Sequence, residues 1–217
     1  MNPKELSELA MLHGAMQKPE ELELLCQFLE GKNAESILEI GTGRGGTLWL
    51  WHHLAGNKTV ISIDLWGGDF GGGPSPEDME RIENWLDKRQ NTFIGNRDSH
   101  KEETVAEVKE ALQSVGAEKL DILYIDGDHA YEGVKKDFEM YSPVVTPGGF
   151  IIFHDILEHP PELNCHVKEF WDEIKSNYQH QEFCVTNSGG MLKTMPQYKV
   201  QETTLAWGGI GVLIWPS

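Results

Sequence analysis

Short apolar runs alternate with amphipathic segments along most of this 217-residue chain. The apolar runs predict five buried strands, at 36–40, 59–64, 91–95, 121–126 and 148–155. Between them, apolar residues recur at helical spacing over 45–55, 76–89, 100–116 and 131–143. This repeated alternation of strand and helix predicts an α/β fold, with a parallel sheet covered by helices on both faces.

The two ends of the chain lie outside this alternation. Helices are expected over about 3–13 and over 18–31, where Pro19 suits the first helical turn and Gly31 suits the stop. A helix at about 162–177 and strands at 182–186 and 209–215 are expected after the last parallel strand. We therefore expect a single domain over 1–217, with 1–33 as an N-terminal helical extension.

Charge and cysteine usage narrow the class of protein. The chain has 35 acidic against 18 basic residues, and its net charge of −17 repels nucleic acids and anionic membranes. We expect neither a signal peptide nor a membrane span, because no apolar run approaches the ~18 residues that a span needs. Three widely spaced cysteines suit a reducing, cytoplasmic location and, without a CxxC pair, do not indicate a structural zinc site.

Ionisable residues fall where the expected strands end. Asp64 and Asp126 end the second and fourth strands, His154 and Asp155 end the fifth, and Asp98 follows the third after a short gap. One such acid alone is usually a turn residue or a helix cap. The carboxyl ends of parallel strands meet at one edge of the sheet, where such sheets bind ligands, so the whole row favours a ligand site.

A glycine motif follows the first strand. Gly41, Gly43 and Gly46 satisfy GxGxxG, a pattern that permits a tight turn and a close approach of a ligand to the backbone. Asp64, 23 residues beyond Gly41, is placed to hold ribose hydroxyls. These features leave open an NAD(P)-binding oxidoreductase, a methyltransferase, and a cofactor-binding interaction domain without catalysis.

Five segments together resemble the class I S-adenosylmethionine-dependent methyltransferases: LEIGTGRGGT, SIDLW, GNRDS, YIDGDHAYEGVKKDF and TPGGFIIFHD. The resemblance is greatest to the small-molecule O-methyltransferases of the cephalosporin-hydroxylase-like and macrolide-sugar type. It implies a Rossmann-like, doubly wound sheet of seven strands, in the order 3-2-1-4-5-7-6 with strand seven antiparallel. It also implies transfer of a methyl group to a hydroxyl of a small molecule, such as a sugar, a natural-product alcohol or a catechol.

The resemblance assigns a cofactor-binding set. Gly41 and Gly43 are expected to face the methionine part of S-adenosylmethionine, and Glu39, directly before the loop, belongs to the same set. Asp64 is expected to hold the ribose. The remaining members are Asp98 and Ser99, expected near the adenine, with Asn96 as a rival to Asp98.

The resemblance also implies a divalent metal. In the metal-dependent relatives, the ion lies between the acid that ends strand four and an acidic pair that ends strand five. Asp126, His154 and Asp155 hold these positions here, and neighbouring strands are close enough, at ~4.8 Å, for their end groups to share one ion. Such ligands suit Mg²⁺ or Mn²⁺. His154 departs from the pattern, because those relatives carry an acid there.

His129 is the predicted catalytic base. It lies three positions after Asp126, as a histidine does in sugar-methylating relatives, and an unperturbed histidine titrates near ~6.5. Asp128 is the rival base, although it also suits a cap of the helix that follows. Substrate identity and oligomeric state stay open: a homo-oligomer is one option, since the apolar C-terminal strand with Trp207 and Trp215 could be core or interface.

Overall fold

The computed structural model of the protein describes residues 1–55, 59–67, 73–86, 91–185 and 207–216. Within these residues, seven strands form one sheet in the order β3-β2-β1-β4-β5-β7-β6. The strands are β1 (Ser36–Ile40), β2 (Thr59–Asp64), β3 (Asn91–Asn96), β4 (Leu120–Ile125), β5 (Val145–His154), β6 (Gln179–Phe183) and β7 (Ile210–Ile214). Strands β1 to β5 pair in parallel, and β7 is antiparallel to both neighbours. The predicted fold class and strand order are confirmed.

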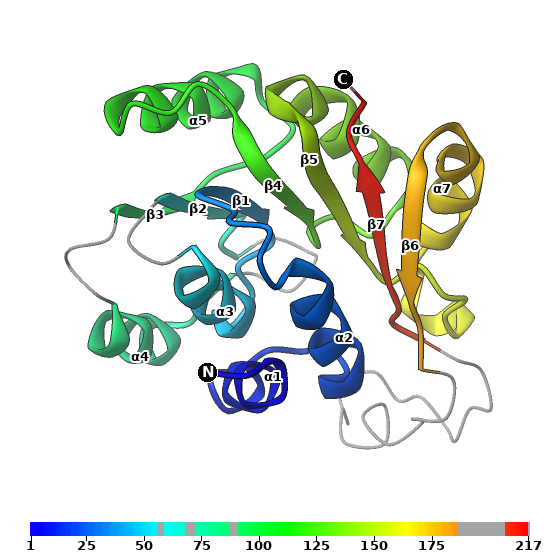
Figure 1. Ribbon diagram of the computed structural model, residues 1–217, viewed down its shortest axis with the longest axis horizontal. Coiled ribbons are helices and arrows are strands. Elements are labelled where there is room, and N and C mark those ends of the chain that lie inside the picture. The colour runs from blue at the N-terminus through cyan, green and yellow to red at the C-terminus, as the bar shows by residue number, and fades with distance from the viewer. Residues whose placement is uncertain (56–58, 68–72, 87–90, 186–206, 217) are drawn as a thin grey trace.

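Helices cover both faces of the sheet (Figure 1). One face carries α1 (Pro3–Leu12), α2 (Pro19–Leu29), α3 (Gly46–Leu54) and α4 (Pro76–Trp85). The other carries α5 (Glu102–Ser114), α6 (Tyr131–Tyr141) and α7 (Val167–Ile174). Short 3-10 turns occupy η1 (Ser142–Val144), η2 (Pro161–Leu163) and η3 (Lys175–Asn177). Each face has its own apolar core, so α1 and α2 of the predicted extension form part of one layer.

The N-terminal helices are placed by local signals and by one close contact. Asn2 and Glu5 form a capping box at the start of α1, and Pro19 occupies the first turn of α2. The turn between these helices presses against the start of α3, where a Cβ on Gly46 would lie 1.8 Å from the nitrogen of Ala15. Only a glycine fits there. Because of this close contact, the chain that leads into α2 lies near the carboxyl edge of the sheet.

The structure corrects the predicted elements near the C-terminus. Strand β6 is Gln179–Phe183 rather than 182–186, and four of its five residues are exposed, so the edge strand shows no apolar alternation. The helix expected over 162–177 is divided into η2, α7 and η3. The sequence also predicts a glycine-rich loop at 66–76 and an irregular stretch at 187–207. Residues 68–72 and 187–206 of these stretches lie outside the described residues, as does the end of the helix expected over 76–89.

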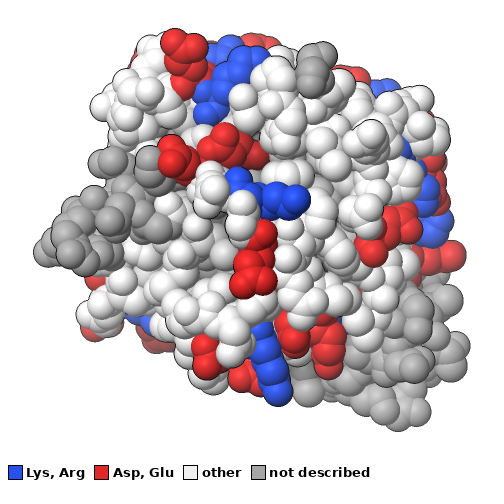
Figure 2. All heavy atoms as spheres, viewed as in Figure 1, with Lys and Arg blue, Asp and Glu red and all other residues white. Residues whose placement is uncertain are grey.

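Strand β7 lies between β5 and β6, and its residues Ile210, Val212 and Leu213 are fully buried. The apolar C-terminal strand is therefore core. Among the described helices, none combines the length and the apolar character needed to cross a bilayer. On the face shown in Figure 2, the described acidic and basic side chains are interspersed among uncharged ones.

Candidate active site

The glycine loop and Asp64 meet at the carboxyl ends of β1 and β2. The backbone N–H of Gly43 donates to Asp64 Oδ2 at 2.8 Å. Gly41 has a left-handed φ of 99°, and a Cβ on it would lie 2.0 Å from the carbonyl oxygen of Asp126. Burial raises the pKa of Asp64, although backbone N–H groups that include that of Gly43 counteract this. The loop thus joins the predicted ribose-binding carboxylate to the end of β4.

Glu39 lies beneath this loop and does not itself face the site. Its side chain is fully buried, and it accepts hydrogen bonds from Trp51 Nε1 at 3.1 Å and from the Ser62 hydroxyl. The Ser62 hydroxyl also lies 2.7 Å from that of Thr42 in the glycine loop. Burial raises the pKa of Glu39 to about 8, although hydrogen bonds from Ser62 and Thr47 oppose the rise. Glu39 is therefore connected to the glycine loop through Ser62 and Thr42, and its place in the cofactor-binding set stays a prediction.

Asp98, Ser99 and Asn96 follow the end of β3. Asp98 Oδ1 accepts the backbone N–H of His100 at 2.9 Å, and the Ser99 carbonyl accepts the Tyr141 hydroxyl at 2.9 Å. Asn96 is the register partner of Asp64 and accepts the backbone N–H of Trp66 at 3.0 Å. All three stay candidates for the adenine end, and Asn96 lies on the strand directly beside the predicted ribose ligand.

Asp126, His129, His154 and Asp155 meet at the ends of β4 and β5. His154 Nδ1 lies 3.4 Å from Asp126 Oδ1 and 3.2 Å from Asp155 Oδ1. His129 Nε2 lies 3.3 Å from Asp126 Oδ1 and 3.4 Å from Asp155 Oδ2. Asp155 itself has a left-handed φ of 63°, a conformation that costs a non-glycine residue ~1–3 kcal/mol. The structure thus brings together the predicted metal ligands and the predicted base.

Opposite charges dominate this cluster. Burial acts to raise the pKa of Asp126 and Asp155, but His154 lies beside both and holds their pKa values below the usual range. Burial acts to lower the pKa of His129, yet its hydrogen bond to Asp126 and the charge of Asp155 raise it to about 9. At neutral pH the protein alone therefore holds His129 in its protonated form.

Asp128 has a structural role beside His129. Its Oδ1 accepts the backbone N–H of Ala130 at 2.8 Å, and Ala130 is the residue that precedes α6. The cap expected of Asp128 is not formed, because the N-cap residue of α6 is Ala130 and no side chain of the described residues caps this helix. Asp128 instead closes the turn that precedes the helix. His129 is held from the other side, because its carbonyl accepts the backbone N–H of His166 at 2.8 Å.

The N-terminal segment supplies contacts that sequence reasoning missed. Gln17 is buried, and its Nε2 donates to Asp126 Oδ2 at 2.7 Å and to the Tyr124 hydroxyl at 3.3 Å. The Tyr124 hydroxyl in turn donates to Asp126 Oδ2 at 3.2 Å. A polar residue at the start of an amphipathic helix normally faces solvent, so nothing in the local pattern marks Gln17 as a contact of the site.

A buried ion pair next to Gln17 holds two distant segments. Lys18 Nζ lies 3.3 Å from Glu21 Oε1, and the lysine donates to the carbonyl of Val185 at 2.6 Å. Glu21 accepts the backbone N–H groups of Val185 and Gly209, both at 2.8 Å. Helix α2 thus fixes the described residues on either side of 186–206 against the carboxyl edge of the sheet.

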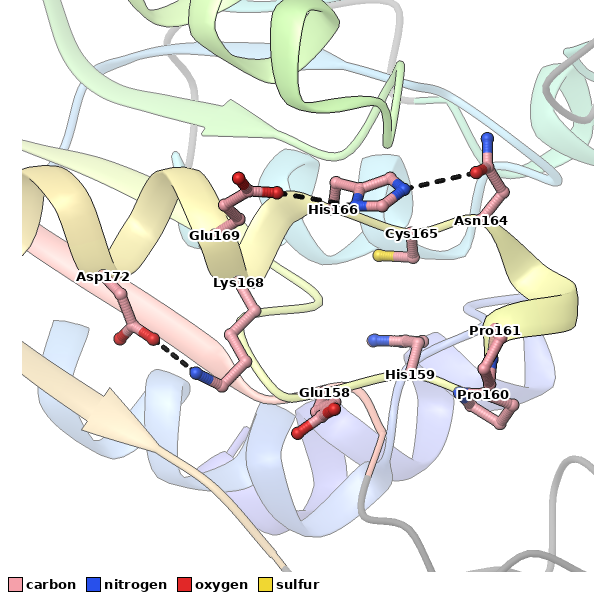
Figure 3. A pocket seen from close by; sticks show the side chains of 10 residues that line it. All are labelled: Glu158, His159, Pro160, Pro161, Asn164, Cys165, His166, Lys168, Glu169 and Asp172. Carbon is pink, nitrogen blue, oxygen red and sulfur yellow. Dashed lines mark hydrogen bonds and ion pairs between the residues drawn. The ribbon is translucent and has the colours of Figure 1, made fainter.

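His159 and Cys165 extend the cluster beyond β5. His159 Nε2 lies 2.9 Å from Asp155 Oδ1, and both His159 and Cys165 line a cavity of about 640 Å³ (Figure 3). The cavity wall consists of Glu158, His159, Pro160, Pro161, Asn164, Cys165, His166, Lys168, Glu169 and Asp172. Sequence reasoning missed both residues, although the spacing Asp-x3-His-x5-Cys was a usable signal.

The donor atoms of Asp126, His154 and Asp155 fit a divalent cation. One ligand atom from each residue lies within 4.8 Å of the others, and two carboxylates face a single ring nitrogen. Two carboxylates and one imidazole are a donor set that Mn²⁺ accepts readily and Mg²⁺ less so. The role of these three residues as metal ligands stays a prediction.

A family model described as a methyltransferase domain matches residues 38–156, which is more than half of the chain. The chain is also similar to an uncharacterised protein of Acanthamoeba polyphaga mimivirus, with 29% identity over 190 residues that cover 81% of this chain and 79% of the relative. A second relative, an uncharacterised protein of Sinorhizobium fredii, is 28% identical over 163 residues. These cover 72% of this chain but only 17% of that relative.

Solved structures share the fold. The O-methyltransferase TomG from Streptomyces achromogenes, in complex with SAM, matches with a TM-score of 0.58 at 16% identity over 98% of this chain and 89% of that chain. An O-methyltransferase from Bacillus cereus, in complex with SAH, matches with a TM-score of 0.55 at 16% identity, over 98% of this chain and 90% of that chain. MycE of the mycinamycin biosynthetic pathway, in complex with Mg and SAH, matches with a TM-score of 0.56 at 16% identity, over 100% of this chain and 55% of that chain. At these identities the likeness establishes the fold.

Proposed function

Because the protein belongs to the methyltransferase-domain family and has the class I fold, we propose that it transfers the methyl group of S-adenosylmethionine to a hydroxyl of a small molecule. Family membership confirms the predicted enzyme class and disfavours the NAD(P)-dependent alternative. The observation that carries the proposal is the Asp126–His129–Asp155 cluster, which lies against the glycine loop where Gly41 touches the end of β4.

The cofactor is proposed to lie over the ends of β1, β2 and β3. The backbone of Gly41 and Gly43 is proposed to approach the methionine part closely, as glycines in such a loop permit. Asp64 turns its carboxylate toward that loop, where it can accept hydrogen bonds from ribose hydroxyls. Asp98, Ser99 and Asn96 lie at or after the end of β3, the strand beside β2, and are proposed to lie near the adenine.

The acceptor hydroxyl is proposed to enter beside Asp126 and His129. The methyl group passes from the sulfonium to the acceptor oxygen, which requires the oxygen to lie in line and at near-attack distance. The hydroxyl proton passes to Nε2 of neutral His129, and SAH leaves as the second product. Since the pKa of His129 is about 9 in the protein alone, the rate should rise with pH until the neutral ring predominates.

Asp126, His154 and Asp155 are the residues proposed to hold a divalent cation. Bound there, such an ion supplies positive charge that lowers the pKa of an acceptor hydroxyl and offsets the carboxylate charge that keeps His129 protonated. Gln17 and Tyr124 keep the Asp126 carboxylate in place, because both reach its Oδ2.

The acceptor is proposed to be a hydroxylated small molecule. The cavity beside Asp155 has a volume of about 640 Å³, within the range of small-molecule sites. Its wall presents both polar and apolar surface, and within it His166 Nε2 lies 3.2 Å from Asn164 Oδ1. The polar side chains of this lining offer hydrogen-bond partners for a sugar or another polyol. The stretches 66–76 and 187–207 are predicted to close the pocket, and residues 68–72 and 187–206 of them fall outside the described residues.

Calorimetry on the purified protein tests the cofactor first. We expect S-adenosylmethionine to bind with a dissociation constant on the order of micromolar, and NAD to give no heat. Methyl transfer to a panel of sugars, alcohols and catechols, measured as SAH formed with and without EDTA and added Mn²⁺, tests the reaction. Binding of NAD without binding of S-adenosylmethionine would overturn the proposal, whereas cofactor binding without transfer to any acceptor would favour an interaction domain.

A further inference from the structure

Three metal-binding residue types converge just beyond the end of β5. Asp155, His159 and Cys165 lie within 11 consecutive residues, and one ligand atom from each lies within 4.8 Å of the other two. The set includes a thiol, which distinguishes it from the Asp126–His154–Asp155 cluster. Two of its members, His159 and Cys165, also line the cavity.

The hydrogen bonds of His159 fix its tautomer. Its Nδ1 lies 2.8 Å from the carbonyl oxygen of Leu157, an acceptor only, so Nδ1 carries a hydrogen. In the neutral ring the lone pair is then on Nε2, and the backbone N–H of Gly208 points at this atom from 3.3 Å. Asp155 Oδ1 nevertheless lies only 2.9 Å from the same nitrogen. In the protein alone a proton on Nε2 bridges this pair, because burial acts to lower the pKa of His159 but the hydrogen bond to Asp155 raises it to about 10. A metal ion that replaces this proton would bind the same two atoms.

His159 is oriented as metal-binding histidines usually are. Such a histidine normally donates its second ring N–H to a carbonyl or carboxylate, which fixes the ring and raises its basicity. His159 does so through Leu157. His154 does not, because its Nε2 is buried and has no hydrogen-bond partner among the described residues. Of His154 and His159, which both lie beside Asp155, His159 is the better prepared to bind an ion.

We propose that Asp155, His159 and Cys165 bind one divalent transition-metal ion of the zinc type. Thiolate and imidazole donors favour zinc over magnesium, and three protein ligands leave a fourth position for water or an added group. Figure 3 shows the side chains of His159 and Cys165 extending in the same direction from two parts of the loop, so an ion can arrive through the cavity.

The proposed site shares Asp155 with the Asp126–His154–Asp155 cluster, so the two sites are linked. An ion held by His159 and Cys165 ties Asp155 to the loop between β5 and α7, which forms the cavity wall. The inference does not rest on the proposed function, since it concerns metal binding in the absence of cofactor and acceptor.

Cobalt is the probe for this site. The full chain, freed of metal by chelator and dialysis, is titrated with Co²⁺ without S-adenosylmethionine. We expect one equivalent to give a thiolate-to-cobalt charge-transfer absorption that Zn²⁺ abolishes and Mg²⁺ leaves unchanged. Cys165→Ser should remove the absorption and weaken zinc binding by about 100-fold or more, since loss of even an outer partner of a ligand costs ~10–100-fold.

Matched variants separate this site from its neighbours. Cys184→Ser changes the other partly buried cysteine, and Asp126→Asn changes the neighbouring cluster; both should keep the absorption. If Cys165→Ser does not fold by circular dichroism, protection of Cys165 from alkylation by Zn²⁺ in the wild-type protein replaces it. Cobalt binding without the thiolate absorption, or unchanged zinc affinity in a folded Cys165→Ser protein, would overturn the proposal. Calorimetry with S-adenosylmethionine on the same samples reports separately on the proposed function.

Discussion

The two halves of the carboxyl edge of the sheet are built in different ways. Around the ends of β1 and β2, the predicted cofactor side, Asp64 and Glu39 are held by neutral hydrogen-bond donors such as the Gly43 backbone and the Ser62 hydroxyl. Around the ends of β4 and β5, Asp126 and Asp155 face imidazole rings, in addition to the neutral donors Gln17 and Tyr124 that reach Asp126. The first half offers shape and hydrogen bonds, and the second concentrates charge.

This difference agrees with a division of labour. A surface of backbone groups and neutral hydrogen-bond donors suits a large cofactor, because it can hold the cofactor in the same orientation at each turnover. Paired carboxylates and histidines suit a place where a proton moves or a cation binds, because their pKa values are set by one another. The halves meet where Gly41 touches the carbonyl of Asp126, so the comparison can be tested by changing one side at a time.

The largest effect is expected from one amide substitution on each side. Asp126→Asn should lower turnover by about 10³-fold, because the charge that pairs with His129 is lost, while S-adenosylmethionine affinity changes little. Asp64→Asn should instead weaken S-adenosylmethionine binding by about 10-fold or more, with turnover at saturating cofactor nearly kept. Steady-state rates and calorimetry on both variants measure this, and a loss of the same parameter in both would break the comparison.

The junction between the halves is tested by Gly41→Ala. Its φ of 99° is strained for alanine, and the new Cβ would meet the Asp126 carbonyl at 2.0 Å. Gly31→Ala is the matched control, since Gly31 has a φ of 74° with no atom within 4 Å of a Cβ. We expect the control to lose ~1–2 kcal/mol of unfolding free energy from backbone strain and Gly41→Ala to lose more than ~3 kcal/mol, measured by urea denaturation. Equal losses would mean that the two halves are not in tight contact.

Glu39→Gln tests the neutral character of the cofactor side. With its pKa at about 8, Glu39 keeps its proton in the folded protein where the unfolded chain has lost it above about 4.5. The unfolded state binds fewer protons over that window, so this group makes the protein less stable as pH rises from about 4.5 to about 8. Glu39→Gln should remove that slope and stabilise the protein by a few kcal/mol at pH 8. Denaturation at pH 5 and pH 8 checks this, and parallel curves for the two proteins would contradict it.

Much of the cofactor side could be predicted from sequence, because its signals are local. A strand ending in GxGxxG, followed by a strand ending in Asp64, specifies both the turn and the acid. The burial of Glu39 could not be predicted, since it depends on Trp51 and Ser62 from other elements.

The acceptor side depends on contacts between distant parts of the chain. Asp126 and Asp155 were predictable as strand ends, but Gln17 reaches Asp126 from 109 residues away, through the packing of α1 and α2. His159 and Cys165 follow a strand end in an irregular loop, where periodicity carries no information. The edge strand β6 was misplaced for a related reason, because an exposed strand lacks the alternation that sequence patterns detect.

The smallest effect on turnover is expected from a substitution of Asp128. Comparing it with a substitution of His129 shows which of the two residues is the catalytic base. Its carboxylate accepts the backbone N–H of Ala130 before α6, so Asp128→Ala should lose a turn hydrogen bond worth ~1 kcal/mol of stability. Turnover should stay within about two-fold, because His129 keeps both of its carboxylate contacts. His129→Gln should instead lower turnover by about 10²-fold or more and flatten its rise with pH, because the titrating base is lost. If Asp128→Ala loses as much turnover as His129→Gln while unfolding at nearly the wild-type urea concentration, Asp128 is the base and its role in the turn is secondary.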